Sequence, residues 1–485
     1  MKANDVVADE AIPSAVPERT AESGWSRRMW AMLIVLCGAM FLDALDNAMV
    51  GIAVPPIQAE FGMSTSAVQW VVSAYVLGFG GFLLVGGRLA DIVGRRRLLL
   101  LGVGAFAVAS AVGGLAQDGT WVIAARFIMG VAAAFTAPAG LAIIVTTFPE
   151  GPQRNRAVGI YTACGATGFS LGLVAGGILT QIGWRWTFFL PVLAALAILV
   201  GAIALVPRDA AVAEPKPRID WVGAFSITAA MLLLVFGLVE APTRGWTSTP
   251  ILASFVGALI LVVAFVITEK SVAFPLVRLE FLRNGGLVGA SLFAAAILGT
   301  YMSFQFIGAL YLQELRGWEP IEMALGFLPA GLLIAFFAPR AGGYLGKLGI
   351  KKMIVIGFVA YTLAYLLFLR IGLESSYAPY ILPSMLLIGV AFPFSFTGSY
   401  VQATSGVADE EQGLAAGILQ TGYQVGAALV LALTTATMTA NTGPGREGKL
   451  DGYHAGIWVV SAVSVVALIG AVVSWLSTRK VTQDA

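Results

Sequence analysis

Three ionisable residues lie well inside long apolar stretches of the sequence: Asp43, Asp46 and Arg126. A charge at the centre of a bilayer costs about 2.5 to 3.5 kcal/mol on insertion scales, so such residues usually pair with one another or face a water-filled cavity. A carboxylate removed from water favours its neutral form, whereas a nearby cation favours the charged form. A carboxylate whose cationic partner comes and goes can therefore bind and release a proton.

The two aspartates are spaced to share one side of a helix. Asp43, Asp46, Asn47 and Val50 follow steps of three, four and seven residues, which place side chains on one helix face. We expect this face to border a cavity, with Asp46 as the proton carrier and Arg126 as its intermittent partner. Asp43 is then a second acid or a docking point for a cationic substrate. The alternative interpretation is a fixed internal ion pair that only positions helices.

The elements around these residues are predicted to be membrane-spanning helices. The chain is 58% hydrophobic and 12% charged, with a mean hydropathy of +0.86. Soluble domains average about 25% charged residues, and apolar runs of about 18 or more residues indicate bilayer-spanning helices. The sequence therefore predicts an all-α integral membrane protein. Fourteen runs are predicted to span, near residues 30–53, 67–87, 98–116, 121–146, 158–180, 187–206, 220–239, 250–268, 287–312, 322–340, 352–371, 378–401, 413–438 and 454–476.

The order of these runs predicts two six-helix bundles with an inserted pair. A second copy of one pattern supports this division, because GRLADIVGRRR, from Gly87 to Arg97, is echoed by GYLGKLGIKK, from Gly343 to Lys352. Repeated six-helix bundles are a transporter architecture, with the substrate site between the halves. The predicted divisions are an N-terminal tail at 1–29, a bundle at 30–206, linkers with the inserted helices at 207–286, a bundle at 287–476 and a tail at 477–485.

Charge and cysteine content limit the location and the partners. Most Lys and Arg residues fall on the side of the N-terminus when the runs are threaded through a membrane, which predicts cytoplasmic N- and C-termini. The excess of Arg over Lys, with abundant Ala, Gly and Val, indicates a bacterial source and hence the cell inner (plasma) membrane. The net charge of +2 suggests no nucleic-acid partner. Cys37 and Cys164 both lie in apolar runs and offer neither a disulfide framework nor a metal site. We expect no cofactor and a functional monomer.

Several motifs together resemble a known family. These motifs are the GRLADIVGRRR loop, LDNAMVGIAVP from Leu45 to Pro55, RFIMG from Arg126 to Gly130, and GFSLGLVAGG from Gly168 to Gly177. They resemble the major facilitator superfamily and, within it, the fourteen-helix drug:proton antiporter family 2. The resemblance covers nearly everything from Trp30 to Trp475. It implies a major facilitator fold and drug or antibiotic efflux driven by the proton motive force.

Two of these motifs carry candidate functional roles. In the loop motif, Gly87, Asp91, Gly94, Arg95 and Arg96 are expected to form charge pairs that hold the cytoplasmic side in one conformation and release it in the other. The arginines also suit a topological anchor.

The second motif is the one resembling the antiporter motif of helix five, although Leu173 replaces its usual proline. Its glycines are spaced for tight helix packing, which is the competing interpretation. They are Gly168, Gly172, Gly176 and Gly177.

Polar amides among aromatic and methionine side chains predict an adaptable substrate cavity. The candidates are Asn47, Tyr75, Met129, Phe135, Tyr161, Gln305, Gln420 and Gln424. The predicted function is a proton-coupled antiporter that exports small neutral or cationic amphiphiles across the lipid bilayer. The alternatives are a proton symporter importing a nutrient or metabolite, and a membrane sensor without transport. Enzymatic activity is not expected, because the single histidine, His454, lies at a helix mouth with no nucleophile and orienting group to complete a catalytic set.

Overall fold

The computed structural model describes residues 25–148, 152–208, 220–272, 283–405, 407 and 412–483, and within them every regular element is a helix. The N-terminal six and the inserted pair are α1 (Arg27–Phe61), α2 (Thr65–Val93), α3 (Arg95–Gly114), α4 (Gly119–Thr147), α5 (Pro152–Ile182), α6 (Trp186–Leu205), α7 (Trp221–Arg244) and α8 (Thr249–Ser271). The remainder are α9 (Gly285–Ala309), η2 (Leu310–Leu315), α10 (Pro320–Phe337), η3 (Ala338–Arg340), α11 (Ala341–Leu348), α12 (Ile350–Phe368), α13 (Tyr377–Tyr380), α14 (Leu382–Thr404), α15 (Gln412–Asn441) and α16 (Gly445–Gln483).

The prediction of an all-α membrane protein is confirmed. In the described part of the chain, thirteen helical segments are long and apolar enough to cross a membrane, and the shorter apolar stretch Thr167–Ile182 lies in α5. Several helices run further than the apolar runs predicted. The apolar run predicted at 30–53 ends before Pro55 and Pro56, but α1 continues through both prolines to Phe61. Prolines are tolerated in membrane helices because neighbouring groups satisfy the freed backbone carbonyls.

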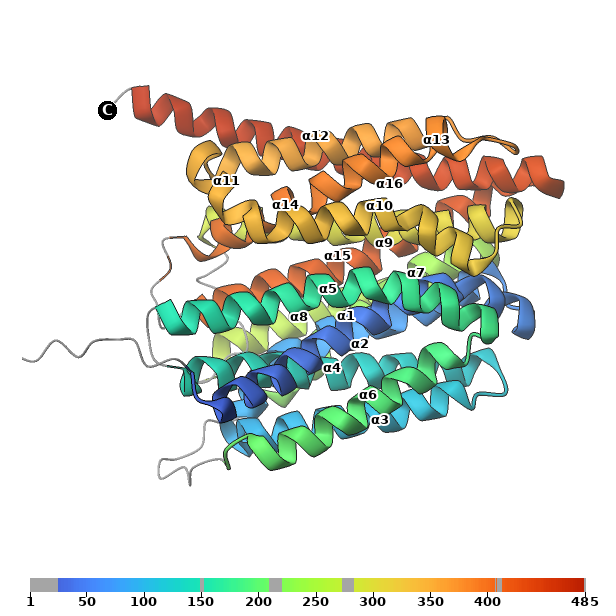
Figure 1. Ribbon diagram of the computed structural model, residues 1–485. Coiled ribbons are helices and arrows are strands. Elements are labelled where there is room, and N and C mark those ends of the chain that lie inside the picture. The colour runs from blue at the N-terminus through green and yellow to red at the C-terminus, as the bar shows by residue number, and fades with distance from the viewer. Residues whose placement is uncertain are drawn as a thin grey trace, which may run out of the picture.

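The helices form two bundles with the same internal packing. In the N-terminal bundle α1 packs against α5 and α6, α2 against α4, and α3 against α4 and α6. In the C-terminal bundle α9 packs against α15 and α16, α10 against α14, and α12 against α14 and α16. Each contact in the first set has its counterpart in the second. Figure 1 shows α3 with α6 at one edge of the molecule and α12 with α16 at the opposite edge.

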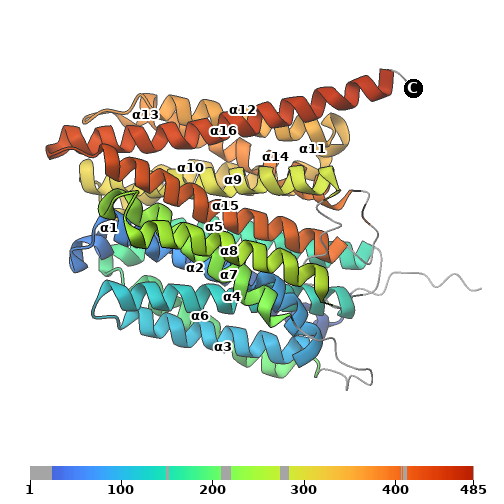
Figure 2. The same cartoon turned by 180° about the vertical axis from the view of Figure 1, so that it is seen from behind.

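The bundles meet along two equivalent seams, α2 against α15 and α5 against α10, and α1 also contacts α9. The inserted helices α7 and α8 pack mainly against each other, and α7 also contacts α2 and α15. One of these contacts is a hydrogen bond of 3.0 Å from the Thr228 hydroxyl to the Gly81 carbonyl. Figure 2 shows the pair in front of the bundles, so it covers the α2/α15 seam.

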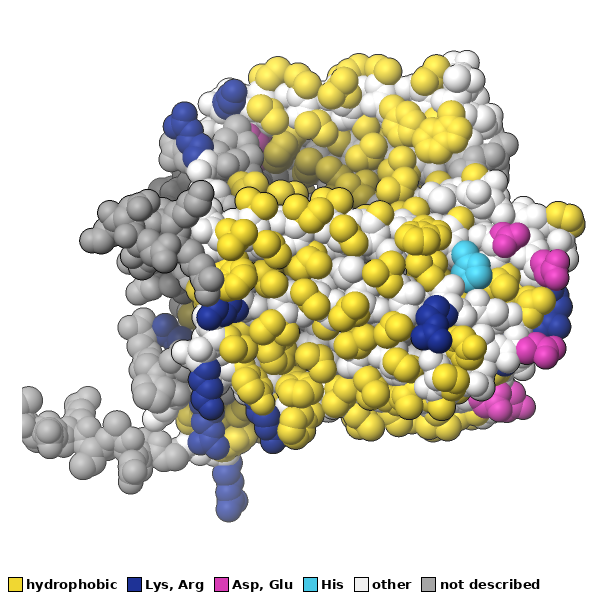
Figure 3. Space-filling model, turned by 90° about the horizontal axis from the view of Figure 1, so that it is seen from above, with side chains coloured by type: hydrophobic (Ala, Val, Ile, Leu, Met, Phe, Trp, Pro, Cys, Tyr) yellow, Lys and Arg dark blue, Asp and Glu magenta, His cyan; other side chains and the backbone are white. Residues whose placement is uncertain are grey.

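The outer surface suits a lipid environment. Leu259, Ile260 and Ile267 of α8 are each more than 60% exposed, because α8 packs on one side only. On the face drawn in Figure 3, hydrophobic side chains form a broad band, most Lys and Arg side chains gather near one end, and Asp and Glu side chains gather near the other. This distribution is typical of a protein that crosses a membrane with one strongly basic side.

The two copies of the loop motif turn in the same way. Gly94 separates α2 from α3 with φ 101°, and Gly349 separates α11 from α12 with φ 79°. Positive φ favours glycine because it has no Cβ. The echoed glycines of the sequence therefore occupy equivalent turns of the two bundles.

Candidate functional site

The centre of the site is an ion pair between α1 and α4. A guanidinium nitrogen of Arg126, Nη1, contacts Oδ2 of Asp46, and both side chains are almost completely buried. The Nε of Arg126 donates to the Val71 carbonyl of α2 at 3.1 Å. The other carboxylate oxygen of Asp46, Oδ1, has no hydrogen-bond partner. A buried carboxylate with one free oxygen retains a position at which a proton can bind.

Tyr75 of α2 links this pair to Asp43. The Arg126 guanidinium carbon lies 4.3 Å from the centre of the Tyr75 ring, a cation–π arrangement. The Tyr75 hydroxyl donates to Oδ1 of Asp43. The order of groups is therefore Asp46, Arg126, Tyr75 and Asp43, with acidic groups at both ends. Tyr75, predicted as a cavity residue, lies between the two acids.

Glycines bring α2 and α4 close enough to form this arrangement. A Cβ added at Gly130 of α4 would lie 2.1 Å from the Tyr75 carbonyl, and one added at Gly78 of α2 would lie 2.5 Å from the Phe127 carbonyl. No side chain fits at either position, so the two backbones are in contact. This contact sets the guanidinium of Arg126 over the Tyr75 ring.

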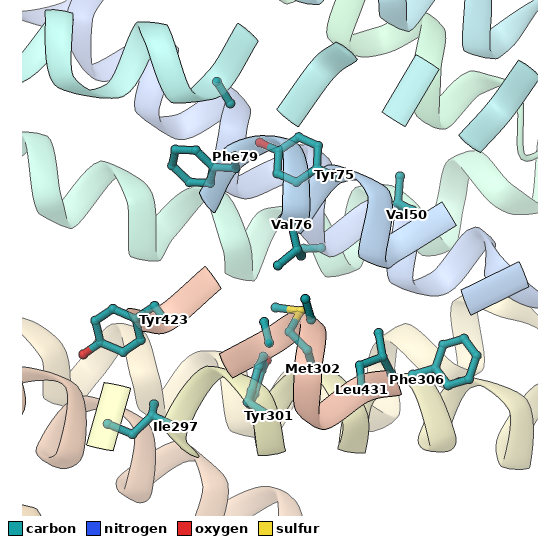
Figure 4. Close-up of a cluster of buried hydrophobic side chains, with 14 of the residues drawn as sticks. Val50, Tyr75, Val76, Phe79, Ile297, Tyr301, Met302, Phe306, Tyr423 and Leu431 are labelled. Atoms are coloured by element: carbon teal, nitrogen blue, oxygen red, sulfur yellow. The ribbon is translucent and has the colours of Figure 1, made fainter. Parts of the chain in front are cut away.

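A small cavity lies beside the ion pair, between the bundles. Asn47, Val50 and Arg126 line it from the N-terminal bundle, and Met302 and Gln305 line it from the C-terminal bundle. It has room for about one water molecule, whereas a drug-sized ligand needs a pocket of about 300 to 1,000 Å³. Apolar side chains close the space around it, and Figure 4 shows Val76 of α2 opposite Met302 of α9. The bundles must therefore separate before a larger molecule can enter.

The acidic face of α1 is split between two cavities. Asn47 and Val50 line the cavity between the bundles, but Asp43 lines a second cavity inside the N-terminal bundle, together with Phe106 and Thr136. The predicted face therefore does not border a single cavity, because Asp43 lies in the second one and Asp46 lines neither, although its partner Arg126 lines the first. Asp43 shares the side of α1 that Asn47 and Val50 occupy but lies four residues, about 6 Å, before Asn47 along the helix axis, so the two spaces follow one another along α1. Asn47 also donates its amide to the Asp43 carbonyl at 3.0 Å.

The other predicted cavity residues have varied surroundings. Met129 is fully buried in α4, and Phe135 packs edge-on against Phe82. The Tyr161 hydroxyl donates to the Ala137 carbonyl at 3.3 Å. Gln424 of α15 is buried, and its Cβ would be 2.6 Å from a Cβ added at Gly80 of α2, whereas Gln420 is half-buried. None of these five lines the cavity between the bundles.

The described arginines of the loop motif contact the N-terminal bundle itself. Arg95 donates to the Ala142 carbonyl of α4 at 3.4 Å, and Arg96 donates to the Ile203 carbonyl of α6 at 2.7 Å. Both carbonyls lie near the C-terminal ends of their helices, where a cation is favourable. Gly87 and the side chain of Asp91 lie outside the part of the chain whose surroundings the structure describes.

The glycines of α5 pack on α1. Cβ atoms added at Gly168, Gly172 and Gly176 would approach the backbone of Phe41, Leu45 and Met49, so both helices contribute positions four residues apart. Gly177 instead faces Ala324 of α10, across the seam between the bundles. The strip therefore holds the helix that carries Asp46 in close contact with α5, which is the packing role that its spacing allows.

Sequence reasoning missed the polar contacts between the bundles, and one of them involves α1. Gln313 of η2 donates its amide to the Ile52 carbonyl of α1 at 3.0 Å. The Pro55-Pro56 pair could have indicated this contact. Pro56 has no N–H, so the Ile52 carbonyl lacks its helical donor and needs another. Among the described residues, no cluster of three or more His, Cys, Asp or Glu side chains could hold a metal ion.

These features define a class of protein: a multi-pass membrane protein made of two repeated helix bundles, with buried charges beside the space between them. The sequence model of the Major Facilitator Superfamily matches residues 36–431. The chain therefore belongs to that superfamily, as its motifs predicted.

The similar proteins include antibiotic resistance and export proteins. The puromycin resistance protein pur8 of Streptomyces alboniger is 34% identical over an alignment of 489 positions that covers 97% of this chain and 96% of that protein. The cephamycin export protein CmcT of Amycolatopsis lactamdurans is 30% identical, with 90% of each chain covered. The tetracenomycin C resistance and export protein of Streptomyces glaucescens is 29% identical and covers 95% of this chain and 86% of its own.

Solved structures share the fold at low sequence identity. An inward-facing bacterial homologue of the human lysosomal transporter Spinster superposes with a TM-score of 0.64 at 16% identity, covering 95% of this chain and 99% of its own. The nucleoside transporter NupG gives a TM-score of 0.62 at 13% identity, covering 93% and 99%. At these identities the similarity shows the fold alone.

Proposed function

We propose that this protein is a proton-coupled antiporter that exports small amphiphilic compounds, such as drugs, antibiotics or related metabolites, by alternating access. The observation that carries the proposal is the buried Asp46–Arg126 pair beside the cavity between the bundles. Relatives named for resistance to puromycin and for export of cephamycin support the outward direction. The small central cavity supports alternation, because the halves must move before a substrate can bind or leave.

In the proposed cycle, a proton binds Asp46 when the site opens to the outside. The carboxylate becomes neutral and Arg126 loses its charge partner, but the guanidinium keeps the Val71 carbonyl and the Tyr75 ring. Asp43, on the other side of Tyr75, remains to balance its charge. When the site opens to the cytoplasm, the proton leaves, Asp46 pairs with Arg126 again, and substrate binds for export.

The proton gradient supplies enough free energy for this exchange. A membrane potential of about 100 mV gives about 2.3 kcal/mol for each charge moved. One proton exchanged for one neutral substrate then supports a concentration ratio of roughly fortyfold, since about 1.4 kcal/mol corresponds to a factor of ten. Exchange of one proton for a monocation is electroneutral and is driven by the pH difference alone. The two acids, Asp43 and Asp46, also permit a two-proton cycle.

The proposal includes the setting in which the exchange occurs. The protein lies in the inner membrane of a bacterium, with both termini in the cytoplasm, and works as a monomer without a cofactor. The substrate is neutral or cationic, because Arg126 is the one described cation that lines the central cavity and Asp46 already neutralises it. An importer of anionic nutrients would need additional cationic groups there.

Transport in everted membrane vesicles tests the proposal. Respiration acidifies the vesicle interior, so an antiporter should accumulate ethidium, an amphiphilic monocation, and lose this activity when the pH difference is collapsed. Asp46→Asn should abolish the pH-driven accumulation. Asp118→Asn is the matched control, because Asp118 is an exposed N-cap of α4 and asparagine caps a helix equally well.

Two results would contradict the proposal. Accumulation that persists in the Asp46→Asn vesicles would remove Asp46 from proton coupling. A protein that leaves drug susceptibility of the host cell unchanged for every compound, while it raises proton-dependent uptake of a nutrient, would be an importer. Size-exclusion chromatography of the purified variant separates loss of transport from loss of folding.

A further inference from the structure

Two consecutive prolines leave two carbonyls of α1 without helical donors. In an α-helix the N–H of each residue bonds the carbonyl four residues earlier, and proline has no N–H. Pro55 and Pro56 therefore release the carbonyls of Gly51 and Ile52. Both residues are buried, and a buried carbonyl without a partner is unfavourable. Some other donor has to satisfy these oxygens whenever water is excluded from them.

An amide of the opposite bundle supplies the donor for Ile52. Gln313 lies in η2, a π-helical continuation of α9, and its Nε2 donates to the Ile52 carbonyl at 3.0 Å. The same amide contacts the sulfur of Met323 in α10 at 2.9 Å. A π-helical turn rotates the residues that follow relative to a regular helix, and such turns frequently occur at functional sites. Here the turn directs Gln313 at α1.

Gln305 lies two turns earlier on α9, opposite Gly51, whose carbonyl is the other one that the prolines release. A Cβ added at Gly51 would be 2.6 Å from Nε2 of Gln305, so the amide approaches the backbone of Gly51 as closely as a glycine allows. Gln305 is 3% exposed, and its Nε2 has no hydrogen-bond partner. Two amides of the C-terminal bundle thus lie against the two residues that the prolines deprive of helical bonds.

Other hydrogen bonds join the bundles at the same end of the molecule, away from the termini (Figure 1). Gln181, at the end of α5, donates to Glu319, which precedes α10, at 2.8 Å. The hydroxyls of Ser66, at the start of α2, and Thr439, near the end of α15, are 3.4 Å apart. One of these contacts lies on each seam, so this end is closed on both sides.

We propose that Gln313 is a gating residue whose amide replaces the N–H that Pro56 lacks, and thereby stabilises closure of the bundles at the end away from the termini. When the bundles part there, water can bond the Ile52 carbonyl, so both conformations satisfy the same oxygen. The two prolines make this carbonyl available to the other bundle. The inference rests on the proposed alternating access, but it concerns closure of one end and needs no particular substrate.

A thiol-labelling experiment tests the contact. Ser66→Cys is nearly isosteric and places a thiol at the closed end, where Ser66 is 3% exposed. Cys37 and Cys164 are replaced by alanine in every variant, and the purified full chain in lipid nanodiscs is labelled with a membrane-impermeant maleimide. Gln313→Leu should increase the labelling rate about two- to twelvefold, which is the range for one net hydrogen bond. Gln313→Asn, with its shorter side chain, should do the same.

Pro56→Ala makes the test specific. The alanine N–H bonds the Ile52 carbonyl within α1 in both conformations, so Gln313 no longer favours closure. Pro56→Ala should therefore increase labelling, and the double variant with Gln313→Leu should label no faster than either single variant. Gln402→Leu is the matched control, because Gln402 makes the same kind of bond, 3.0 Å to the Gly286 carbonyl, within the C-terminal bundle.

The outcomes separate this inference from the proposed function. Wild-type labelling rates in both Gln313 variants, or additive effects of Gln313→Leu and Pro56→Ala, would overturn the gating role. A monodisperse profile on size exclusion shows that a variant is folded. Because the labelling needs neither a substrate nor a proton gradient, it can succeed in a chain that fails to accumulate ethidium, and the reverse result is equally possible.

Discussion

Removing Arg126 alone should destabilise the protein much more than removing both members of the buried ion pair. Arg126→Met leaves the Asp46 carboxylate buried without its cation, and breaking a buried pair in this way costs about 3 to 5 kcal/mol. The loss has an upper limit, because protonating an ordinary aspartate at pH 7 costs about 4 kcal/mol. We therefore expect the free energy of unfolding to fall by about 3 to 4 kcal/mol. The double variant Asp46→Asn/Arg126→Met should stay within about 1 kcal/mol of wild type.

The same reasoning predicts how the Arg126→Met variant responds to pH. If the unpaired Asp46 binds a proton in the folded state, folding takes up a proton and stability increases as the pH falls. Between pH 7 and pH 6 the gain should be about 1.4 kcal/mol, the free energy of one pH unit for one proton. The double variant has no acid at position 46 and should lack this gain.

Thermal unfolding of the purified proteins in one detergent, at pH 6 and pH 7, measures these differences. The ethidium assay in everted vesicles is run on the same variants, and both should be inactive. A double variant that is as unstable as Arg126→Met would refute the electrostatic reasoning. A stable double variant that still accumulates ethidium would mean that proton coupling does not need the pair.

Two further substitutions test the surroundings of the pair. Tyr75→Phe leaves Asp43 without its hydroxyl donor and should lower the free energy of unfolding, measured by thermal unfolding, by about 1 to 3 kcal/mol. No change would show that water replaces the hydroxyl. Gly172→Ala places a Cβ 2.6 Å from the Leu45 carbonyl oxygen and should lower the free energy of unfolding by about 1 to 3 kcal/mol. Gly104→Ala is the control, because its Cβ meets open space and should cost nothing. Equal effects of the two substitutions in thermal unfolding would contradict the close packing of α5 on α1.

The fold and the central charges were largely predictable from local features of the sequence. Apolar runs report spanning helices directly, because each must be long enough to cross the bilayer. Asp46 and Arg126 could be expected to meet, although they are 80 residues apart, because a buried charge requires compensation. The equivalence of Gly94 and Gly349 was visible in the repeated loop pattern.

The geometry between the bundles was less predictable, because it depends on how separate helices are rotated and aligned. Helical spacing could not show that Asp43 faces a cavity inside one bundle while Asn47 faces the cavity between the bundles. The contact of Gln313 with Ile52 joins positions 261 residues apart and depends on a π-helical turn. No local pattern for that turn was recognised in the sequence. The small size of the central cavity likewise depends on the relative position of the two bundles.

The placement of α7 and α8 makes the molecule unequal on its two lipid-facing flanks. This pair shields the junction of α2 with α15, whereas in the described part of the chain no helix pair shields the junction of α5 with α10. Hydrocarbon tails therefore reach the boundary of the two halves directly along one flank only. A hydrophobic molecule dissolved in the bilayer therefore meets the packed α5/α10 junction directly on one flank, and meets α7 and α8 on the other.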